Sequence, residues 1–380
     1  MATGHGTHAP VARLRPLAET LFDAAWDDLA AHAAEPNVFA EPWFLDAARA
    51  LPQSAGVQLL IAHQDDQLIG AIPLCIDPKY GRLPLGHVET WLHYHSFLGT
   101  PLLRAGHEIA AWSAMLEALD RSDWARGLIH FTGLAEHGPA HRALVAAARS
   151  LGRPCPTVHR IERAALAGDL SPEAYCETHV RKKKRKELKR LAARLAEMGT
   201  LTTRRFAASD DRAAWADAYL ALEARGWKGQ AGSALAADPA TRAFFHAALA
   251  GAEAAGRLDM LRMDLDGRPI AMLVNFLAPP GGFAFKTTFD EDYARFSPGV
   301  LLQIENLVLL DRPALDWVDS CAVENHSMID SIWAERRAIV RVTLPLAGAR
   351  GAATYALARA AETAAGAVRA LRSRPETVNA

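Results

Sequence analysis

Apolar residues along the chain follow two different spacings. In several segments they recur every three or four positions, which is typical of helices with one buried face. These segments are 18–33, 43–51, 108–121, 140–151, 213–227 and 240–256. Between them lie short apolar runs of strand length, such as 127–134 and 283–286. Because helical and strand-like segments alternate, the pattern predicts a mixed α/β protein.

Two of the strand-like regions have the form of β-hairpins. Residues 57–76 and 258–278 each contain two apolar runs separated by a polar turn, and the two regions can be aligned. A spacing of about 200 residues also relates Gly99 to Gly299, each of which lies in a turn before an apolar stretch. We therefore expect two copies of one α/β unit.

The length of 380 residues, half of them hydrophobic, is sufficient for two domains with large cores. The pattern suggests four parts. These are a mobile N-terminal tail (1–18), a first unit with a structural role (19–165), a second unit that carries the activity (166–348), and an Ala-rich C-terminal helix and tail (349–380).

Charge and cysteine content narrow the class of protein. A net charge of -1 argues against a dedicated nucleic-acid-binding protein, which normally needs a basic surplus. The four cysteines form no CxxC pair, which is typical of reduced thiols in a cytoplasm. The chain opens without an apolar signal region and has no run of about 18 apolar residues. We expect a cytoplasmic monomer or homodimer without a membrane span.

One basic run, RKKKRKELKR at 181–190, stands out against this neutral background. Leu188, Leu191, Leu195 and Met198 follow at helical spacing, which predicts an amphipathic helix with its apolar side on the second unit. The basic side chains are then either a solvated face or a patch that attracts the phosphates of a donor or an anionic acceptor. Binding of tRNA or of a membrane surface is a further alternative.

The segment around Ser297-Pro298-Gly299 begins a predicted helix after a strand and an acidic loop. Serine is a good N-cap, proline suits the first helical position, and glycine lets a ligand approach the backbone. The N–H groups of Gly299, Val300 and Leu301, aided by the helix dipole, would form an anion site that fits a pyrophosphate. Alternatively, the turn merely starts a helix.

The segment ALEARGWKG marks the end of another predicted helix, near Gly226. Trp227 and Lys228 follow directly, where an aromatic ring and an amine could line a cleft, and Glu223 lies one turn back. A core tryptophan and a solvated lysine are the equally simple alternative.

A third segment carries Asp319 and Cys321 on a predicted strand, His326 in the polar turn that follows, and Trp333 on a short helix. Titratable groups at a strand end are well placed for general acid/base catalysis. Cys321 and His326 as nucleophile and base are a less favoured alternative, because a small buried residue is expected within a strand.

Other motifs give no support to common enzyme classes. His93 and His95 lie on one face of a strand, as metal ligands can, but no further ligand has recognisable spacing. We expect no metal. The chain contains no GxSxG, Walker loop, HExxH or GxGxxG pattern, which removes the usual support for hydrolases, P-loop NTPases, zincins and Rossmann enzymes.

The informative segments together resemble the CelD/BcsL-like branch of the GNAT acyltransferases. This branch is related to the Fem-type aminoacyltransferases, which carry two GNAT units in tandem. The resemblance rests on EARGWKG, GRPIAMLVNF, FAFKTTFDEDYARFSPGVLL and DSCAVENHSMIDSIWAERR, in this order. It implies tandem units, each with a mixed, mostly antiparallel sheet flanked by helices. It also implies transfer of an acyl group from coenzyme A, usually acetyl-CoA, to an amine or a hydroxyl.

The resemblance also assigns residues. It places Ser297, Gly299, Val300 and Leu301 at the pyrophosphate-binding turn. It places Lys286 and Asp290 at the strand end and loop that face the cleft. The catalytic candidates are therefore Lys286, Asp290, Asp319, His326 and Glu223. The candidates for contact with the acceptor are Trp227, Lys228, Tyr293 and Trp333.

The expected function is an acyl-CoA-dependent N- or O-acyltransferase that acts on a small molecule or a saccharide, in polysaccharide or natural-product assembly. The Ser-Pro-Gly turn is shorter than the Gln/Arg-x-x-Gly-x-Gly/Ala turn of most GNAT proteins, which leaves the donor open. An aminoacyl-tRNA-dependent transferase and a non-catalytic binding protein with this fold are the alternatives.

Overall fold

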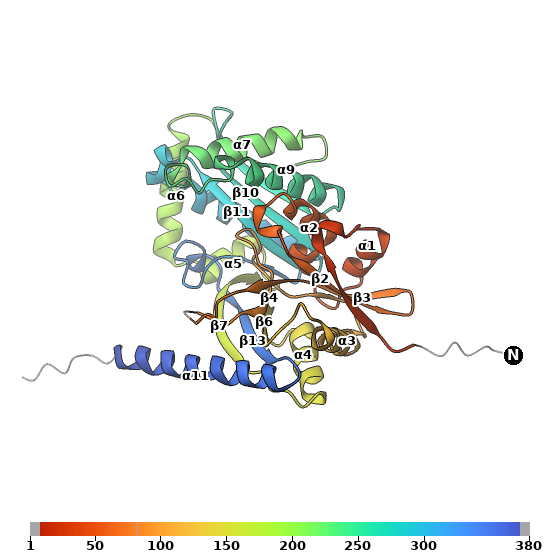
Figure 1. Ribbon diagram of the computed structural model, residues 1–380. Coiled ribbons are helices and arrows are strands. Elements are labelled where there is room, and N and C mark those ends of the chain that lie inside the picture. The colour runs from red at the N-terminus through yellow and green to blue at the C-terminus, as the bar shows by residue number, and fades with distance from the viewer. Residues whose placement is uncertain (1–7, 82, 373–380) are drawn as a thin grey trace, which may run out of the picture.

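The computed structural model describes residues 8–81 and 83–372, with side chains up to residue 364 (Figure 1). Within these residues thirteen strands form one continuous sheet in the order β1-β2-β3-β4-β6-β13-β7-β12-β11-β10-β9-β8, with β5 paired to β3. Most neighbours are antiparallel, and the predicted mixed α/β class is confirmed.

The first half of the chain supplies one end of the sheet and the helices around it. Its strands are β1 (Val11–Pro16), β2 (Gln58–Gln64), β3 (Gln67–Asp77), β4 (His87–Thr90), β5 (Leu102–Leu103), β6 (Leu128–Ala135) and β7 (Thr157–Ala167). Its α-helices are α1 (Ala24–Ala31), α2 (Pro42–Ala48), α3 (Glu108–Arg121) and α4 (Pro139–Ser150).

The second half repeats this layout. Its strands are β8 (Leu201–Arg205), β9 (Leu258–Leu265), β10 (Arg268–Ala278), β11 (Gly281–Phe289), β12 (Trp317–Asp319) and β13 (Glu335–Pro345). Its α-helices are α5 (Pro172–His179), α6 (Lys182–Ala196), α7 (Arg212–Arg225), α8 (Trp227–Gln230), α9 (Pro239–Ala254), α10 (Pro298–Glu305) and α11 (Ala349–Arg372). The short 3-10 turn η5 (Glu291–Phe296) precedes α10, and the short 3-10 turn η7 (Ile329–Ser331) precedes β13.

The two halves exchange strands at the centre of the sheet. β13, which follows all the other described strands in sequence, pairs with β6 on one side and with β7 on the other. β7 in turn pairs with β12 of the second half. The suggested boundary at residue 165 therefore falls inside a strand that both halves use, and the two units share one sheet.

A single hydrophobic core spans both halves on one face of this sheet. It includes Trp26 and Phe44 from the first half and Tyr219 and Phe244 from the second. Figure 1 shows α2 beside α9, across the junction of the two halves. Helices α3 and α4 cover a second core on the first half. Burial of these aromatic side chains is the main force that holds the units together.

Both predicted hairpins are present, as β2–β3 and β9–β10, and α3 matches its predicted bounds. Two details differ. Helix α1 begins at Ala24, with Asp23 as its N-cap, so Leu21 precedes the helix and is 84% exposed. The predicted mobile tail is wrong over Val11–Pro16, which form β1 and pair with β2, while residues 1–7 lie outside the described part.

Candidate active site

The strands β11 and β12 separate at the centre of the second unit. They pair in parallel over Gly281–Phe283, after which β12 ends while β11 continues to Phe289. Just beyond this point the register of β11 against β10 shifts, because Val274 pairs with Lys286 and Asn275 with Ala284. Phe285 is therefore the extra residue of a β-bulge, a feature that bends a strand and redirects its side chains.

Lys286 lies at this bulge among aromatic rings. Its Nζ is 5.0 Å from the ring centroid of Phe285 and 5.6 Å from that of Phe97, which comes from the first unit. Burial, and after it the nearby charge of Lys228, lower the pKa of Lys286 to about 8, while Glu223 opposes the shift. At pH 7 about one amine in ten is then neutral and able to accept a proton.

Glu223 is buried beside this lysine with both carboxylate oxygens engaged. Oε1 accepts a hydrogen bond from Nζ of Lys228 at 2.7 Å, and Oε2 accepts one from the N–H of Leu235 at 2.8 Å. The pair fixes the loop after α7. Trp227 is 58% exposed at the surface, and its backbone N–H donates to Oε1 of Glu291 at 2.5 Å. Glu223 thus forms an ion pair that supports the loop, and the prediction that it acts as a base stays a prediction.

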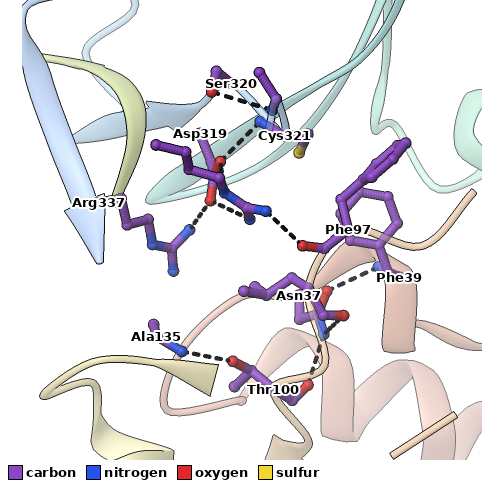
Figure 2. Close-up of polar contacts among 12 residues, drawn as sticks. Asn37, Phe39, Phe97, Thr100, Ala135, Asp319, Ser320, Cys321 and Arg337 are labelled. Carbon is purple, nitrogen blue, oxygen red and sulfur yellow. Dashed lines mark hydrogen bonds and ion pairs between the residues drawn. The ribbon is translucent and has the colours of Figure 1, made fainter. Parts of the chain in front are cut away.

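Asp319 is fully buried at the junction of the two units (Figure 2). Its carboxylate pairs with Arg163 of β7 at 2.7 Å and with Arg337 of β13 at 3.1 Å, and it accepts the N–H of Cys321 at 2.9 Å. Arg163 also donates to the carbonyl of Phe97 at 2.8 Å. The two guanidinium groups lower the pKa of Asp319. These contacts give the carboxylate a structural role, because it joins three segments, and the prediction that it acts in acid/base catalysis stays a prediction.

Asp290 also has a supporting place. It is buried, accepts the N–H of Asp292 at 3.2 Å, and forms an ion pair with Arg268 at 3.1 Å. These contacts cap η5 and hold the acidic loop.

Two of the predicted acceptor contacts lie in hydrophobic clusters, since Trp333 is fully buried and Tyr293 is half-buried against α6 and β10. The prediction that Trp333 faces an acceptor is wrong for this structure.

A groove of about 780 Å³ lies between α6, the start of α10 and the loop that contains η7. The basic run contributes Arg181, Lys183 and Lys184 to it, and the opposite side carries Ser297 and Val300. The loop adds a third wall with Ser327, Asp330, Ser331 and Ala334. One edge of α6 therefore lines the groove, while the buried leucines of that helix pack on β9 and β10 as predicted.

The turn before α10 differs from the predicted anion site. Ser297 has φ 54° and ψ 50°, so it is left-handed, and its side chain makes no capping hydrogen bond. Its carbonyl accepts the N–H groups of Val300 at 2.9 Å and Leu301 at 3.0 Å. Two of the three predicted amides are thus already used within the turn. An anion here would depend on the basic side chains of α6 more than on the backbone of α10.

His326 lies in the loop beside this groove. Its ring is half-buried, and Nδ1 has no hydrogen-bond partner among the described residues. Its carbonyl accepts the N–H of Asp330 at 3.0 Å, which ties it to the groove wall. Cys321 is buried away from bulk solvent, and burial raises the pKa of its thiol, so the structure opposes Cys321 as a nucleophile.

The corresponding place in the first unit is closed by the chain itself. β4 and β6 form the parallel pair there, and Gly99 donates its N–H to the carbonyl of Gly133 at 2.8 Å. A Cβ on Gly99 would lie 2.0 Å from the carbonyl oxygen of Thr132. His93 and His95 are buried nearby, and burial lowers the pKa of each to about 3. They are neutral core residues.

Two contacts of the site could not be predicted from the sequence. Nζ of Lys184 donates to Oγ of Ser331, a contact between residues 147 positions apart. Phe97 reaches Lys286 from the other unit. No local pattern predicts either contact, because each depends on how the two halves pack.

Comparison with known proteins identifies a family model that matches part of the chain. Residues 182–307, less than half of the chain, match the family model described as "Acetyltransferase (GNAT) domain", so the resemblance to the GNAT acyltransferases is confirmed over this segment. No curated protein sequence matches the chain. None of the described helices combines the length and the apolar character that a membrane crossing needs.

Solved structures share the fold over most of the chain. FemX has a TM-score of 0.57 and 9% identity, covering 87% of this chain and 96% of its own. L-PGS from Bacillus licheniformis has a TM-score of 0.54 and 10% identity, covering 89% and 96%. The C-terminal domain of a putative lysylphosphatidylglycerol synthetase from Agrobacterium fabrum has a TM-score of 0.52 and 12% identity, covering 88% and 93%. The tandem GNAT-like fold is thereby confirmed.

Proposed function

We propose that this protein transfers an acyl group from an acyl-CoA, with acetyl-CoA as the first donor to consider, to an amine or hydroxyl of a small molecule or saccharide. The observation that carries the proposal is the basic groove of Arg181, Lys183 and Lys184 against the start of α10. Two of its walls, α6 and the start of α10, lie within residues 182–307, which match a GNAT acetyltransferase domain. Natural-product and polysaccharide assembly are the processes that such acceptors suggest.

The groove suits the phosphates of coenzyme A. Its volume of about 780 Å³ is in the range of small-molecule sites. Arg181 and Lys183 are exposed and can move toward a phosphate, whereas Lys184 is half-buried and already donates to Ser331. Desolvation lowers the pKa of Lys184, so a phosphate beside it would favour its charged form. The acyl end of the donor would point toward the separation of β11 from β12.

Lys286 is the base that we propose for the reaction. Neutral Lys286 accepts the proton of the acceptor amine while the amine nitrogen bonds to the thioester carbonyl carbon. The C–S bond then breaks, and the thiolate leaves as free coenzyme A after it takes a proton from the lysine or from solvent. Phe285 and Phe97 keep water from the side-chain amine of Lys286, and this exclusion of water lowers the pKa of Lys286.

An aminoacyl-tRNA donor is the second candidate. The likeness to FemX, to L-PGS and to the C-terminal domain of a putative lysylphosphatidylglycerol synthetase motivates it, although identities of 9 to 12% establish the fold alone. Helix α6 also carries Lys182, Lys186 and Lys189, which are exposed and do not line the groove. These lysines could contact a polynucleotide, and binding would then fall steeply with salt.

The test is to incubate the purified protein with a panel of acyl-CoAs and, separately, with charged tRNA. Native mass spectrometry would detect binding, and release of free thiol would detect turnover. Saturable acyl-CoA binding supports the proposal. Salt-sensitive binding of charged tRNA with no acyl-CoA binding would replace it with the second candidate. Acyl-CoA binding without turnover for any amine or sugar would indicate a non-catalytic protein.

A further inference from the structure

Metal-ligating side chains gather in the first unit, where β3 ends and β4 begins. Asp77 of β3 is paired across the sheet with His87 of β4, and Cys75 with Glu89. Positions two apart on a strand share one face, so these four side chains project from the same side of the two strands. His87 is 3% exposed, and Asp77 and Glu89 are half-buried.

Each of three residues in this cluster has one polar atom held by a neighbour, which leaves another for a shared ligand. Nδ1 of His87 lies 3.3 Å from the carbonyl of Leu85, an arrangement that places the proton on Nδ1 and the lone pair on Nε2. Asp77 accepts the N–H of Lys79 at 2.8 Å through Oδ1. Supporting hydrogen bonds of this kind orient metal ligands in proteins.

Glu89 has the same division of roles. Its Oε1 accepts the hydroxyl of Thr132 at 2.8 Å and lies 3.4 Å from the guanidinium of Arg341. Its Oε2 faces His87, at 3.9 Å from Nε2. That distance is too long for a hydrogen bond. The imidazole lone pair and a carboxylate oxygen therefore face each other across a small gap, which is unfavourable unless a cation lies between them.

The spacing of the three groups is close to that of a metal site. One ligand atom from each of Asp77, His87 and Glu89 lies within 4.8 Å of the other two. Two ligands on one tetrahedral zinc lie about 3.3 Å apart, so rotation of the two carboxylates would close the site. With Arg341 counted and His87 neutral, the cluster carries one net negative charge, which a divalent cation would reverse to one positive charge.

We infer that Asp77, His87 and Glu89 bind one Zn²⁺ ion, with water in the remaining position. An imidazole and two carboxylates suit zinc, and the ion would join the end of β3 to the start of β4. This inference is independent of the proposed acyl transfer, since none of the three residues lines the basic groove. Cys75 borders the carboxylates, and their negative charges together with burial raise the pKa of its thiol to about 12.

The competing explanation is a protonated His87 that pairs with both carboxylates and binds no metal. The experiment is native mass spectrometry and titration calorimetry of the full chain with zinc at pH 7.5, after dialysis against a chelator. We expect one tightly bound zinc per chain and a rise of several degrees in melting temperature at saturation. Glu89→Gln and His87→Gln should each weaken zinc binding at least 10-fold.

Two control variants make the result interpretable. The N-terminal sequence contains His5 and His8, which could also bind zinc, so a His5→Asn/His8→Asn variant should keep the tight site. Asp66→Asn removes an exposed carboxylate of the same unit outside the cluster and should also bind like wild type. Folding of each variant is checked by circular dichroism. Absence of a one-to-one complex at 100-fold molar excess over about 1 μM protein, or equal binding by Glu89→Gln and wild type, would overturn the site.

Discussion

The two units hold a parallel strand pair in corresponding places, but one pair is closed and the other is open. In the first unit the segment after β4 folds back so that Gly99 bonds to the backbone of Gly133. In the second unit β11 continues past the end of β12, and a bulge presents Lys286 at the separation. A repeated fold can thus keep its strand order while the segment after its fourth strand differs between the two copies.

The grooves of the two units also differ in charge. A groove of about 620 Å³ in the first unit is lined by Asp28, Asp65 and Asp66 and includes His107, which precedes α3. The second groove has Arg181, Lys183 and Lys184 on one wall, together with the acids Glu187 and Asp330, and it includes Ser297, which precedes α10. An anionic ligand would meet more positive charge in the second groove than in the first. This difference supports the proposal that the second unit carries the activity.

The largest expected effect is on turnover, in Lys286→Met. Removal of the proposed base should lower kcat about 100- to 10,000-fold, and wild-type kcat/KM should rise with pH until about pH 8. The same variant should have an unfolding free energy about 1 to 3 kcal/mol higher than wild type at pH 7, because a buried charge is removed. Its urea midpoint should rise accordingly. Unchanged turnover would exclude Lys286 from the chemistry.

The pH dependence of stability gives an independent check on Lys286. Because the pKa in the folded state is below that of the unfolded chain, wild type should gain stability as pH rises from about 8 toward 10.5. Lys286→Met should lack this gain. Urea unfolding at pH 7 and pH 9.5 measures both slopes.

The next effect is on the junction between the units, in Asp319→Asn. Two buried guanidinium groups would lose their counter-charge, and we expect a loss of about 3 to 5 kcal/mol in unfolding free energy. Asp330→Asn is the control, since its ion pair with Arg336 is long at 3.8 Å and partly exposed, and should cost less than about 1 kcal/mol. A stable Asp319→Asn protein with little activity would instead support the prediction that Asp319 takes part in catalysis.

A matched glycine pair tests the closed and open places directly. Gly99→Ala would press a methyl group against the carbonyl of Thr132 and should destabilise the protein by about 3 kcal/mol. Gly299→Ala meets the ring of Phe289 at 3.2 Å and lies in a helix, so its effect should stay within about 1 kcal/mol. Equal melting temperatures for the two variants would contradict the comparison of the units.

The smallest effect distinguishes two faces of one helix. Arg181→Gln/Lys183→Gln/Lys184→Gln should raise the KM for acyl-CoA about 5- to 20-fold at low salt, leave kcat nearly unchanged, and lose its effect above about 0.3 M salt.

The matched control for this triple variant is Lys182→Gln/Lys186→Gln/Lys189→Gln, which removes the same charge from residues outside the groove. Similar KM values for the two triple variants would mean that α6 acts only through net charge. Calorimetry with coenzyme A repeats the comparison without turnover.

The sequence predicts the elements of this fold better than its site, for a physical reason. Hairpins and helices such as α3 depend on local periodicity, which the chain displays directly. Asp319 has the local pattern of a catalytic acid at a strand end, yet Arg163 and Arg337 reach it from strands far away in sequence. The basic run predicts the helix α6. Which side of α6 lines the groove cannot be predicted locally, because the groove is closed by a loop that follows β12.

The exchanged strands have a consequence for synthesis of the chain. The place between β6 and β7 is filled by Glu335–Pro345, which are made only after both of those strands and after β8 to β12. Until those residues leave the ribosome, β6 and β7 each have an unpaired edge where β13 will bind. Unpaired strand edges can pair with other chains and so favour aggregation. The sheet of the first unit is therefore complete only after the strands of the second unit have been made, so the two units finish folding together.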